Sequence, residues 1–198
     1  MVWKDKQGNL RFKIVLYGPS LAGKTTMLKQ LYSNIASTLK KGRLRSVEES
    51  STGRTLYFDY APISASGNVC FDIYTVPGQR RHKNQRKIVV NGADAIIFVV
   101  DSDPRALSEN RYSLKELRDF LDDKWGDIPI LYTLNKRDLE DALPPSVLLS
   151  SLDINRDTNT PIFKTVAIDG LGIKRVFQEA AQSSVLWHLH PELYKKSR

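Results

Sequence analysis

Residues 18–25 have the sequence Gly18-Pro19-Ser20-Leu21-Ala22-Gly23-Lys24-Thr25, which matches the pattern G-x-x-x-x-G-K-[ST]. An apolar stretch with strand character precedes it at residues 12–17. After it, over residues 25–39, apolar residues recur every three or four positions. Glycines at a turn between a strand and a helix let backbone N–H groups converge on phosphate oxygens. The stretch therefore predicts a phosphate-binding loop rather than an ordinary turn beside a surface lysine.

Strand-length apolar stretches alternate with stretches of helical period along the rest of the chain, an order typical of α/β proteins. Residues 56–63 and 68–76 should form an antiparallel hairpin, and Val2-Trp3 is a candidate for an extra N-terminal strand. We expect a mostly parallel six-stranded sheet with one antiparallel strand and helices on both faces, in a single domain over residues 1–198. The expected strands are 12–17, 56–63, 68–76, 95–100, 128–134 and 162–167, and the expected helices are 25–39, 105–124, a short one from Pro144, and 176–189.

The composition excludes several classes of protein. The chain has 198 residues, of which 41% are hydrophobic, enough to bury a core. Its one cysteine, Cys70, cannot form an intrachain disulfide, so a cytoplasmic location is expected. No apolar stretch reaches membrane-spanning length. The net charge is +8, but no RNA-binding module accompanies it, so we expect no nucleic-acid partner.

A second motif, Asn135-Lys136-Arg137-Asp138, follows the expected strand 128–134 and indicates which base is bound. Ligands of open α/β sheets bind at the carboxyl ends of the strands. A carboxylate at Asp138 can accept hydrogen bonds from N1–H and N2–H₂ of guanine, whereas adenine has no such pair of donors. Asn135 would tie this loop to the phosphate loop, Lys136 would cover the base plane, and the Ala167 N–H would donate to guanine O6. The motif therefore favours GTP or GDP over ATP.

With these motifs, the chain resembles the small GTPases of the Ras superfamily, and it is more similar still to their MglA-like prokaryotic branch. That branch has Thr-Val-Pro-Gly-Gln where most small GTPases have Asp-x-x-Gly-Gln. The resemblance implies the small G domain of P-loop NTPases, Mg²⁺ as cofactor, GTP hydrolysis, and a switch between two shapes that controls polarity, motility or related signalling. It also implies a Roadblock-domain, MglB-like regulator or effector, and a protein that is monomeric or enters a regulated assembly. The matching stretches are Tyr17-Gly18-Pro19, Gly23-Lys24-Thr25-Thr26, Arg54-Thr55-Leu56-Tyr57-Phe58-Asp59, Thr75-Val76-Pro77-Gly78-Gln79, Phe98-Val99-Val100-Asp101-Ser102 and Asn135-Lys136-Arg137-Asp138-Leu139.

Single residues also receive roles from the resemblance. Gln79 would position the attacking water, and Arg54 would stabilise the transition state as an arginine finger supplied in cis. A solvated arginine at a strand entry is the alternative for Arg54. Thr25 and Thr55 would bind Mg²⁺, and Lys24 would reach the β- and γ-phosphates. The full nucleotide-binding set is Gly18, Ser20, Leu21, Ala22, Gly23, Lys24, Thr25, Thr26, Thr55, Gly78, Asn135, Lys136, Asp138, Val166, Ala167 and Ile168.

Thr75 departs from most small GTPases, in which an aspartate at this position helps to hold Mg²⁺. A threonine carries no charge, and Asp72, three residues upstream, should point to the opposite face of the strand. We therefore expect weak coupling to Mg²⁺ and slow hydrolysis without a partner. The alternative is a GTP-loaded binding or scaffold subunit with little intrinsic hydrolysis.

The excess of positive charge lies in two segments that contain no acid. Both flank the segments that the resemblance identifies as switches. Two solvated basic faces explain them as well as a surface that docks an acidic partner or an anionic membrane. Residues 40–45 contain Lys40, Lys41, Arg43 and Arg45, and residues 80–87 contain Arg80, Arg81, Lys83, Arg86 and Lys87.

Overall fold

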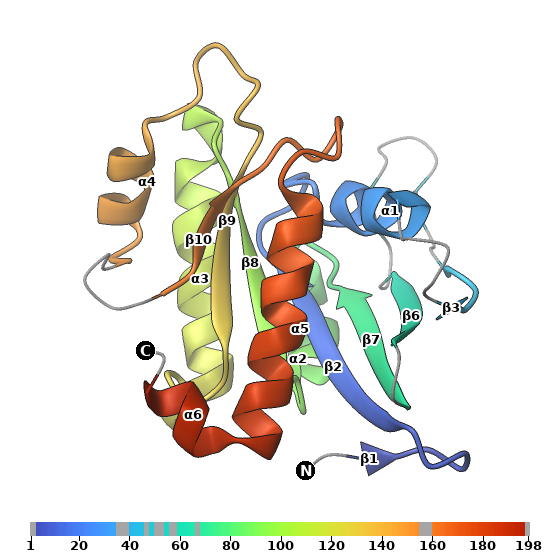
Figure 1. Cartoon of the computed structure of the whole chain (residues 1–198). Helices are drawn as coiled ribbons and strands as arrows, with labels where there is room; N and C mark the ends of the chain where they lie inside the picture. The colour runs from blue at the N-terminus through green and yellow to red at the C-terminus, as the bar shows by residue number, and fades with distance from the viewer. Residues whose placement is uncertain are drawn as a thin grey trace.

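A mixed β-sheet forms the centre of the computed structural model (Figure 1). The structure describes residues 3–34, 40–45, 48–49, 54–55, 59–65, 68–154 and 160–196. Eight strands of this described part join in the order β10-β9-β8-β2-β7-β6-β3, with β1 paired to β2 beside this path. They are β1 (Trp3–Lys4), β2 (Leu10–Tyr17), β3 (Lys40–Lys41), β6 (Tyr60–Ala65), β7 (Val69–Thr75), β8 (Ala95–Asp101), β9 (Ile130–Asn135) and β10 (Ile162–Lys164). A separate pair joins β4 (Glu48–Glu49) to β5 (Arg54–Thr55).

The six central strands have the predicted arrangement. Strands β2, β7, β8, β9 and β10 are parallel, and β6 is antiparallel to β7. Every residue of β8 is buried, because helices cover both of its faces. The expected extra N-terminal strand is present as β1, at Trp3–Lys4, and pairs with the start of β2, while β3 adds two residues beside β6 at one end of the sheet. The predicted fold class is therefore confirmed.

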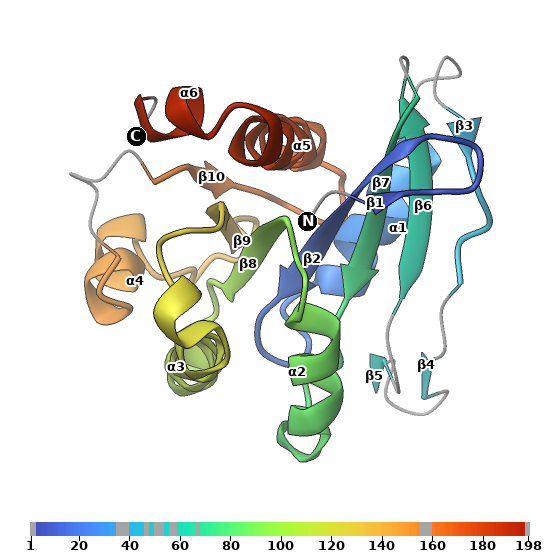
Figure 2. The same cartoon turned by 90° about the horizontal axis from the view of Figure 1, so that it is seen from below.

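Helices cover both faces of the sheet (Figure 2). α1 (Lys24–Asn34) and α5 (Ile173–Leu189) pack on one face, while α2 (Lys83–Val90), α3 (Leu107–Leu121) and α4 (Pro145–Ser151) pack on the other. α6 (Pro191–Lys196) follows α5. Alternate residues of β2 supply the two cores, with Ile14 and Leu16 on the α5 side and Val15 and Tyr17 on the α3 side. This packing brings the carboxyl ends of β2, β8 and β9 to one edge.

Some boundaries differ from the sequence prediction. α2 was not predicted, because only Arg86, Val89 and Val90 of its eight residues are buried and they form no long apolar stripe. β10 ends at Lys164 rather than at residue 167, because Val166 turns to pair with Leu171. The described part of α1 ends at Asn34. Residues 35–39 of the predicted helix and 56–58 of the predicted strand lie outside the described residues.

Candidate nucleotide-binding site

The loop between β2 and α1 requires glycine at two positions. Gly18 has φ +144°, and a Cβ there would lie 2.3 Å from the carbonyl oxygen of Val99 on β8. Gly23 has φ +99°, and a Cβ there would lie 2.3 Å from Nδ2 of Asn135. An L side chain would be strained at both positions and would also collide with a neighbour. The two glycines of the motif therefore let the loop approach the ends of β8 and β9. Of the other predicted loop residues, Ala22 is buried and Leu21 and Thr26 are exposed.

Lys24, the first residue of α1, turns its ammonium group back onto this loop. Its Nζ donates to the carbonyl oxygens of Gly18 at 2.9 Å and Pro19 at 2.6 Å. Burial, together with the nearby charge of Arg86, lowers the pKa of Lys24 to about 7, against the opposing influence of Asp59 and Asp101. A phosphate beside Nζ would favour the charged form of the amine. Lys24 is therefore placed to exchange two carbonyl contacts for phosphate oxygens.

A buried carboxylate lies beside Thr25. Oγ1 of Thr25 donates to Oδ2 of Asp59 at 2.6 Å, and Oγ1 of Thr75 donates to the same oxygen at 2.6 Å. The backbone N–H of Asp59 in turn donates to Oγ1 of Thr75 at 3.0 Å. Asp59 is 1% exposed and Thr75 is fully buried. Hydroxyl and carboxylate oxygens are the ligands that Mg²⁺ prefers, so this cluster fits that ion.

Asp59 corrects the interpretation of Thr75. Asp72, the substitute considered from the sequence, does lie elsewhere and accepts a hydrogen bond from Nε of Arg11 at 2.7 Å. The residue not predicted is Asp59, which lies opposite Thr75 because Tyr60 pairs with Tyr74 in the β6–β7 hairpin. The signal was available, because the register of the predicted hairpin decides which residues face each other. Asp59 thus supplies a carboxylate beside Thr75, a charge that the expectation of weak coupling to Mg²⁺ did not take into account.

The loop after β7 lies directly on the phosphate loop. A Cβ on Gly78 would lie 2.3 Å from Cα and 2.4 Å from the backbone nitrogen of Ser20. Glycine is therefore required here by the close approach of two backbones. Nε2 of the next residue, Gln79, is buried and has no hydrogen-bond partner among the described residues. A buried amide donor of this kind fits a polar ligand at the site.

Asn135 joins three loops at the end of β9. Its Nδ2 donates to the carbonyl oxygen of Ala22 at 2.8 Å, the contact with the phosphate loop expected from the sequence. Its Oδ1 accepts from the Thr165 hydroxyl at 3.0 Å and from the Ala167 N–H at 3.0 Å. In this structure the Ala167 N–H thus donates to Asn135, and its contact with guanine O6 stays a prediction.

The remaining predicted base contacts surround this point. Lys136 adopts φ +61° and its Nζ donates to Oδ2 of the buried Asp101 at 2.6 Å, so its side chain has a fixed anchor. Asp138 is exposed at the same edge. Val166 is half-buried and Ile168 is exposed on the facing loop. The structure therefore brings the phosphate loop and both predicted base-binding loops together.

Comparison with known proteins identifies the family. The model of the ADP-ribosylation factor family matches residues 1–184 of this chain. The chain belongs to this family of small GTPases. Membership in the Ras superfamily, predicted from the motifs, is thereby confirmed.

Individual relatives refine the placement. The "Mutual gliding-motility protein MglA" of Myxococcus xanthus (strain DK1622) is 38% identical over 168 residues, which cover 81% of this chain and 84% of the relative. An ADP-ribosylation factor-like protein 3 from Chlamydomonas reinhardtii is 31% identical over 174 residues, 86% of this chain and 88% of the relative. The solved structure of the Arl6 (BBS3) small GTPase from Trypanosoma brucei, with the bound nucleotide analogue GppNp, superposes with a TM-score of 0.65. It is 22% identical and covers 88% of this chain and 97% of its own, which shows the fold alone. The chain is therefore a small GTPase of the MglA-like kind.

Two predicted site residues of this GTPase have no described side chains. Arg54 and Thr55 form β5, whose backbone pairs with Glu49 and Glu48 of β4. Their side chains lie outside the described residues. The roles of Arg54 as an arginine finger and of Thr55 as a Mg²⁺ ligand stay predictions.

Two of the five basic side chains in residues 80–87 form ion pairs within the protein. Arg86 is buried in an ion pair with Glu116, and Arg80 pairs with Glu109 at 2.7 Å on the surface. Arg81, Lys83 and Lys87 are exposed. Three basic residues of this segment, rather than five, are thus available for docking.

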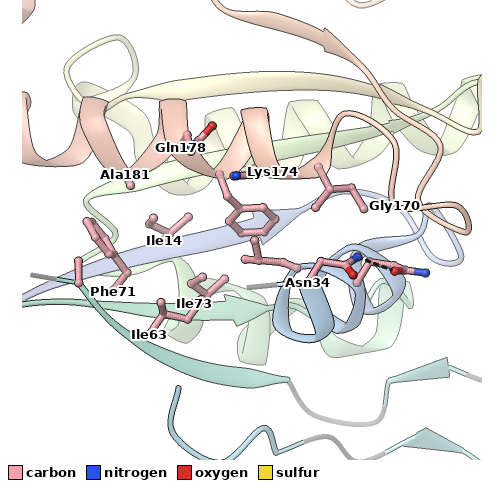
Figure 3. A pocket seen from close by; sticks show the side chains of 14 residues that line it. Ile14, Asn34, Ile63, Phe71, Ile73, Gly170, Lys174, Gln178 and Ala181 are labelled. Carbon is pink, nitrogen blue, oxygen red and sulfur yellow. Dashed lines mark hydrogen bonds between the residues drawn. The ribbon is translucent and has the colours of Figure 1, made fainter. Parts of the chain in front are cut away.

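A separate pocket lies between α1, α5 and strands β2, β6 and β7 (Figure 3). It offers about 200 Å³, and Ile14, Ile63, Phe71 and Ile73 line its sheet side. The lining residues that the structure describes include no carboxylate, thiol or histidine. We therefore assign no chemistry to this pocket.

Among the helices that the structure describes, none combines the length and the apolar character needed to cross a membrane.

Proposed function

We propose that this small GTPase hydrolyses GTP to GDP and phosphate with Mg²⁺, and that residues 1–198 form a single switch domain in the cytoplasm. The observation that supports the proposal is the close packing of Gly78, the residue before Gln79, on Ser20 of the phosphate loop. Lys24 would bind the β- and γ-phosphates, and Asp138 would select guanine. Thr25, Thr55 and Asp59 would hold Mg²⁺, which when bound neutralises charge on the phosphates.

Gln79 would orient the water that attacks the γ-phosphorus. The new bond joins the water oxygen to that phosphorus, and the bond from phosphorus to the oxygen that bridges to the β-phosphate breaks. The bonding electrons stay on GDP, and the proton of the water passes to the phosphate product. Arg54 would stabilise the charge that develops on the transferring group. We also propose, as expected from the sequence, that hydrolysis is slow without a partner.

Replacement of Gln79 by leucine tests this mechanism. We expect the single-turnover rate of GTP hydrolysis to fall about 100-fold, because the variant cannot orient water. The affinity for GTP, measured by displacement of a fluorescent nucleotide, should stay within about twofold, since Gln79 makes no ground-state contact with phosphate in this mechanism. Gln182→Leu on α5 makes the same change at an exposed position away from the site.

An unchanged rate in Gln79→Leu would remove Gln79 from the mechanism. If the wild-type protein retains bound GTP for hours without turnover, the GTP-loaded scaffold replaces the hydrolytic switch as the better hypothesis.

A Roadblock-domain, MglB-like protein is the partner we propose, on the basis of the similarity to MglA. The role would then lie in polarity, motility or related signalling. The exposed Arg81, Lys83 and Lys87 around the start of α2 would steer an acidic surface, either of that partner or of an anionic membrane, toward the switch.

Charge reversal at this surface is expected to weaken docking. The double variant Arg81→Glu, Lys83→Glu should bind the Roadblock-domain partner about tenfold more weakly at low salt, and the loss should shrink as salt screens the charges. Binding is measured by titration calorimetry at several salt concentrations. Lys174→Glu, Arg175→Glu changes the same charge at exposed positions on α5. Equal weakening by both double variants would show an effect of net charge alone.

A further inference from the structure

A buried ion pair lies beneath the loop that carries Gln79. Arg86 of α2 and Glu116 of α3 are 2% and 4% exposed. Nε of Arg86 donates to Oε1 of Glu116 at 2.7 Å, and Nη2 donates to Oε2 at 3.0 Å. The hydroxyls of Tyr17 and Tyr112 donate to the same carboxylate at 2.5 and 3.4 Å. Glu116 is thus fixed from three elements, β2, α2 and α3, and the orientation of Arg86 is fixed with it.

The other N–H groups of Arg86 all point at the backbone of the loop. Nη1 donates to the carbonyl oxygens of Pro77, at 3.1 Å, and Gln79. Nη2 donates to the carbonyl oxygen of Arg80 at 3.2 Å. With the two bonds to Glu116, all five N–H groups of the guanidinium have acceptors. One rigid side chain therefore holds the backbone on both sides of Gly78 and Gln79.

The side chain of Gln79 does not itself anchor the loop. Gln79 precedes the short helical turn at Arg80–His82, and its side chain makes no capping hydrogen bond there. A buried ion pair is also a poor source of stability, because desolvation of two charges offsets much of their attraction. Packing of α2 on α3 would be served as well by apolar side chains. The three carbonyl contacts are what an apolar pair could not supply.

We propose that Arg86 is a positioning residue for GTP hydrolysis: held by Glu116, it sets the backbone of residues 77–80 so that Gln79 lies beside the phosphate loop. This inference rests on the proposed function, because positioning matters only if Gln79 orients the attacking water. Arg86 itself touches no reacting atom. Its effect should therefore be on the rate of hydrolysis rather than on the affinity for nucleotide.

Arg86→Lys tests the inference, because lysine keeps the charge but cannot contact Glu116 and three carbonyls at once. We expect single-turnover hydrolysis to fall between about tenfold and 100-fold, as for a misplaced catalytic group. The dissociation rate of a fluorescent GDP should stay within about twofold of the wild-type rate. Amide hydrogen exchange in residues 77–82 should become faster. Glu116→Gln should give a smaller effect in the same direction.

The matched control is Arg80→Lys, which makes the same substitution in the same loop at an ion pair whose partners are 59% and 43% exposed. It should keep the wild-type rate and exchange. A wild-type hydrolysis rate in Arg86→Lys would overturn the inference, as would an equal loss of hydrolysis and nucleotide affinity. If Arg86→Lys does not fold, a wild-type rate in Glu116→Gln overturns it instead.

Failure of the proposed function gives a different result. A wild-type protein that hydrolyses no GTP would contradict the proposed function itself. Hydrogen exchange then still decides the contact, because unchanged exchange of residues 77–82 in Arg86→Lys would show that Arg86 does not fix the loop.

Discussion

Replacement of Asp59 by asparagine should abolish most of the effect of Mg²⁺ on nucleotide retention. Asparagine keeps the size of the side chain and can still accept from Thr25 and Thr75, but it removes the buried negative charge. In the presence of Mg²⁺, we expect GDP to dissociate about 10- to 100-fold faster than from the wild type, the loss of one strong contact to a charged group. Chelation of Mg²⁺ with EDTA should then accelerate dissociation far less in the variant than in the wild type.

The measurement is the dissociation rate of a fluorescent GDP over a range of Mg²⁺ concentrations. Asp72→Asn is the matched control, because it makes the same change in the same hairpin at a carboxylate bonded to Arg11 and Tyr60. A stricter test exchanges the two partners, Asp59→Thr with Thr75→Asp, which restores one carboxylate from the opposite strand. This double variant should recover much of the dependence on Mg²⁺. Wild-type dependence in Asp59→Asn would exclude Asp59 from the metal site.

The long apolar strands explain why the fold could be predicted from the sequence. Residues 95–100 are uniformly apolar because β8 is buried on both faces. A strand of this kind can therefore be recognised from its own short stretch of sequence. α2 lacks such a pattern. One of its three buried residues is Arg86, a charged residue whose guanidinium is hydrogen-bonded to Glu116 inside the protein. A charged residue gives no sign in a sequence of whether it faces solvent or a buried carboxylate.

The residues of the candidate site also fall into those that the local sequence predicts and those that only the folded structure reveals. The glycines of the phosphate loop were predictable, because their positive φ angles are a local property of the backbone. Asp59 and Glu116 act across the hairpin and between helices, so only the register and the packing of distant elements reveal them. The Ala167 N–H shows the same limit, since its acceptor, Asn135, comes from a different strand. Local motifs thus predict which ligand binds, while the groups that hold the motifs in place come from tertiary contacts.

Asp138→Asn should change the base that the site prefers. The carboxylate would accept from both N1–H and N2–H₂ of guanine, whereas an asparagine amide has one acceptor and presents its own N–H groups to the other donor. Loss of one hydrogen bond to a charged group, and conflict at the second, should weaken GTP binding by about 10²- to 10⁴-fold. Xanthine has an oxygen in place of N2–H₂, so the same asparagine can accept from its N1–H and donate to that oxygen. Xanthosine triphosphate should therefore bind the variant more tightly than GTP does.

Competition of each triphosphate against a fluorescent nucleotide measures both affinities. The control is Asp141→Asn, which changes an exposed aspartate that follows on the same loop. Equal affinities of the wild type and Asp138→Asn for GTP would mean that this carboxylate does not contact the base. The site would then hold the phosphates without using Asp138 to select guanine.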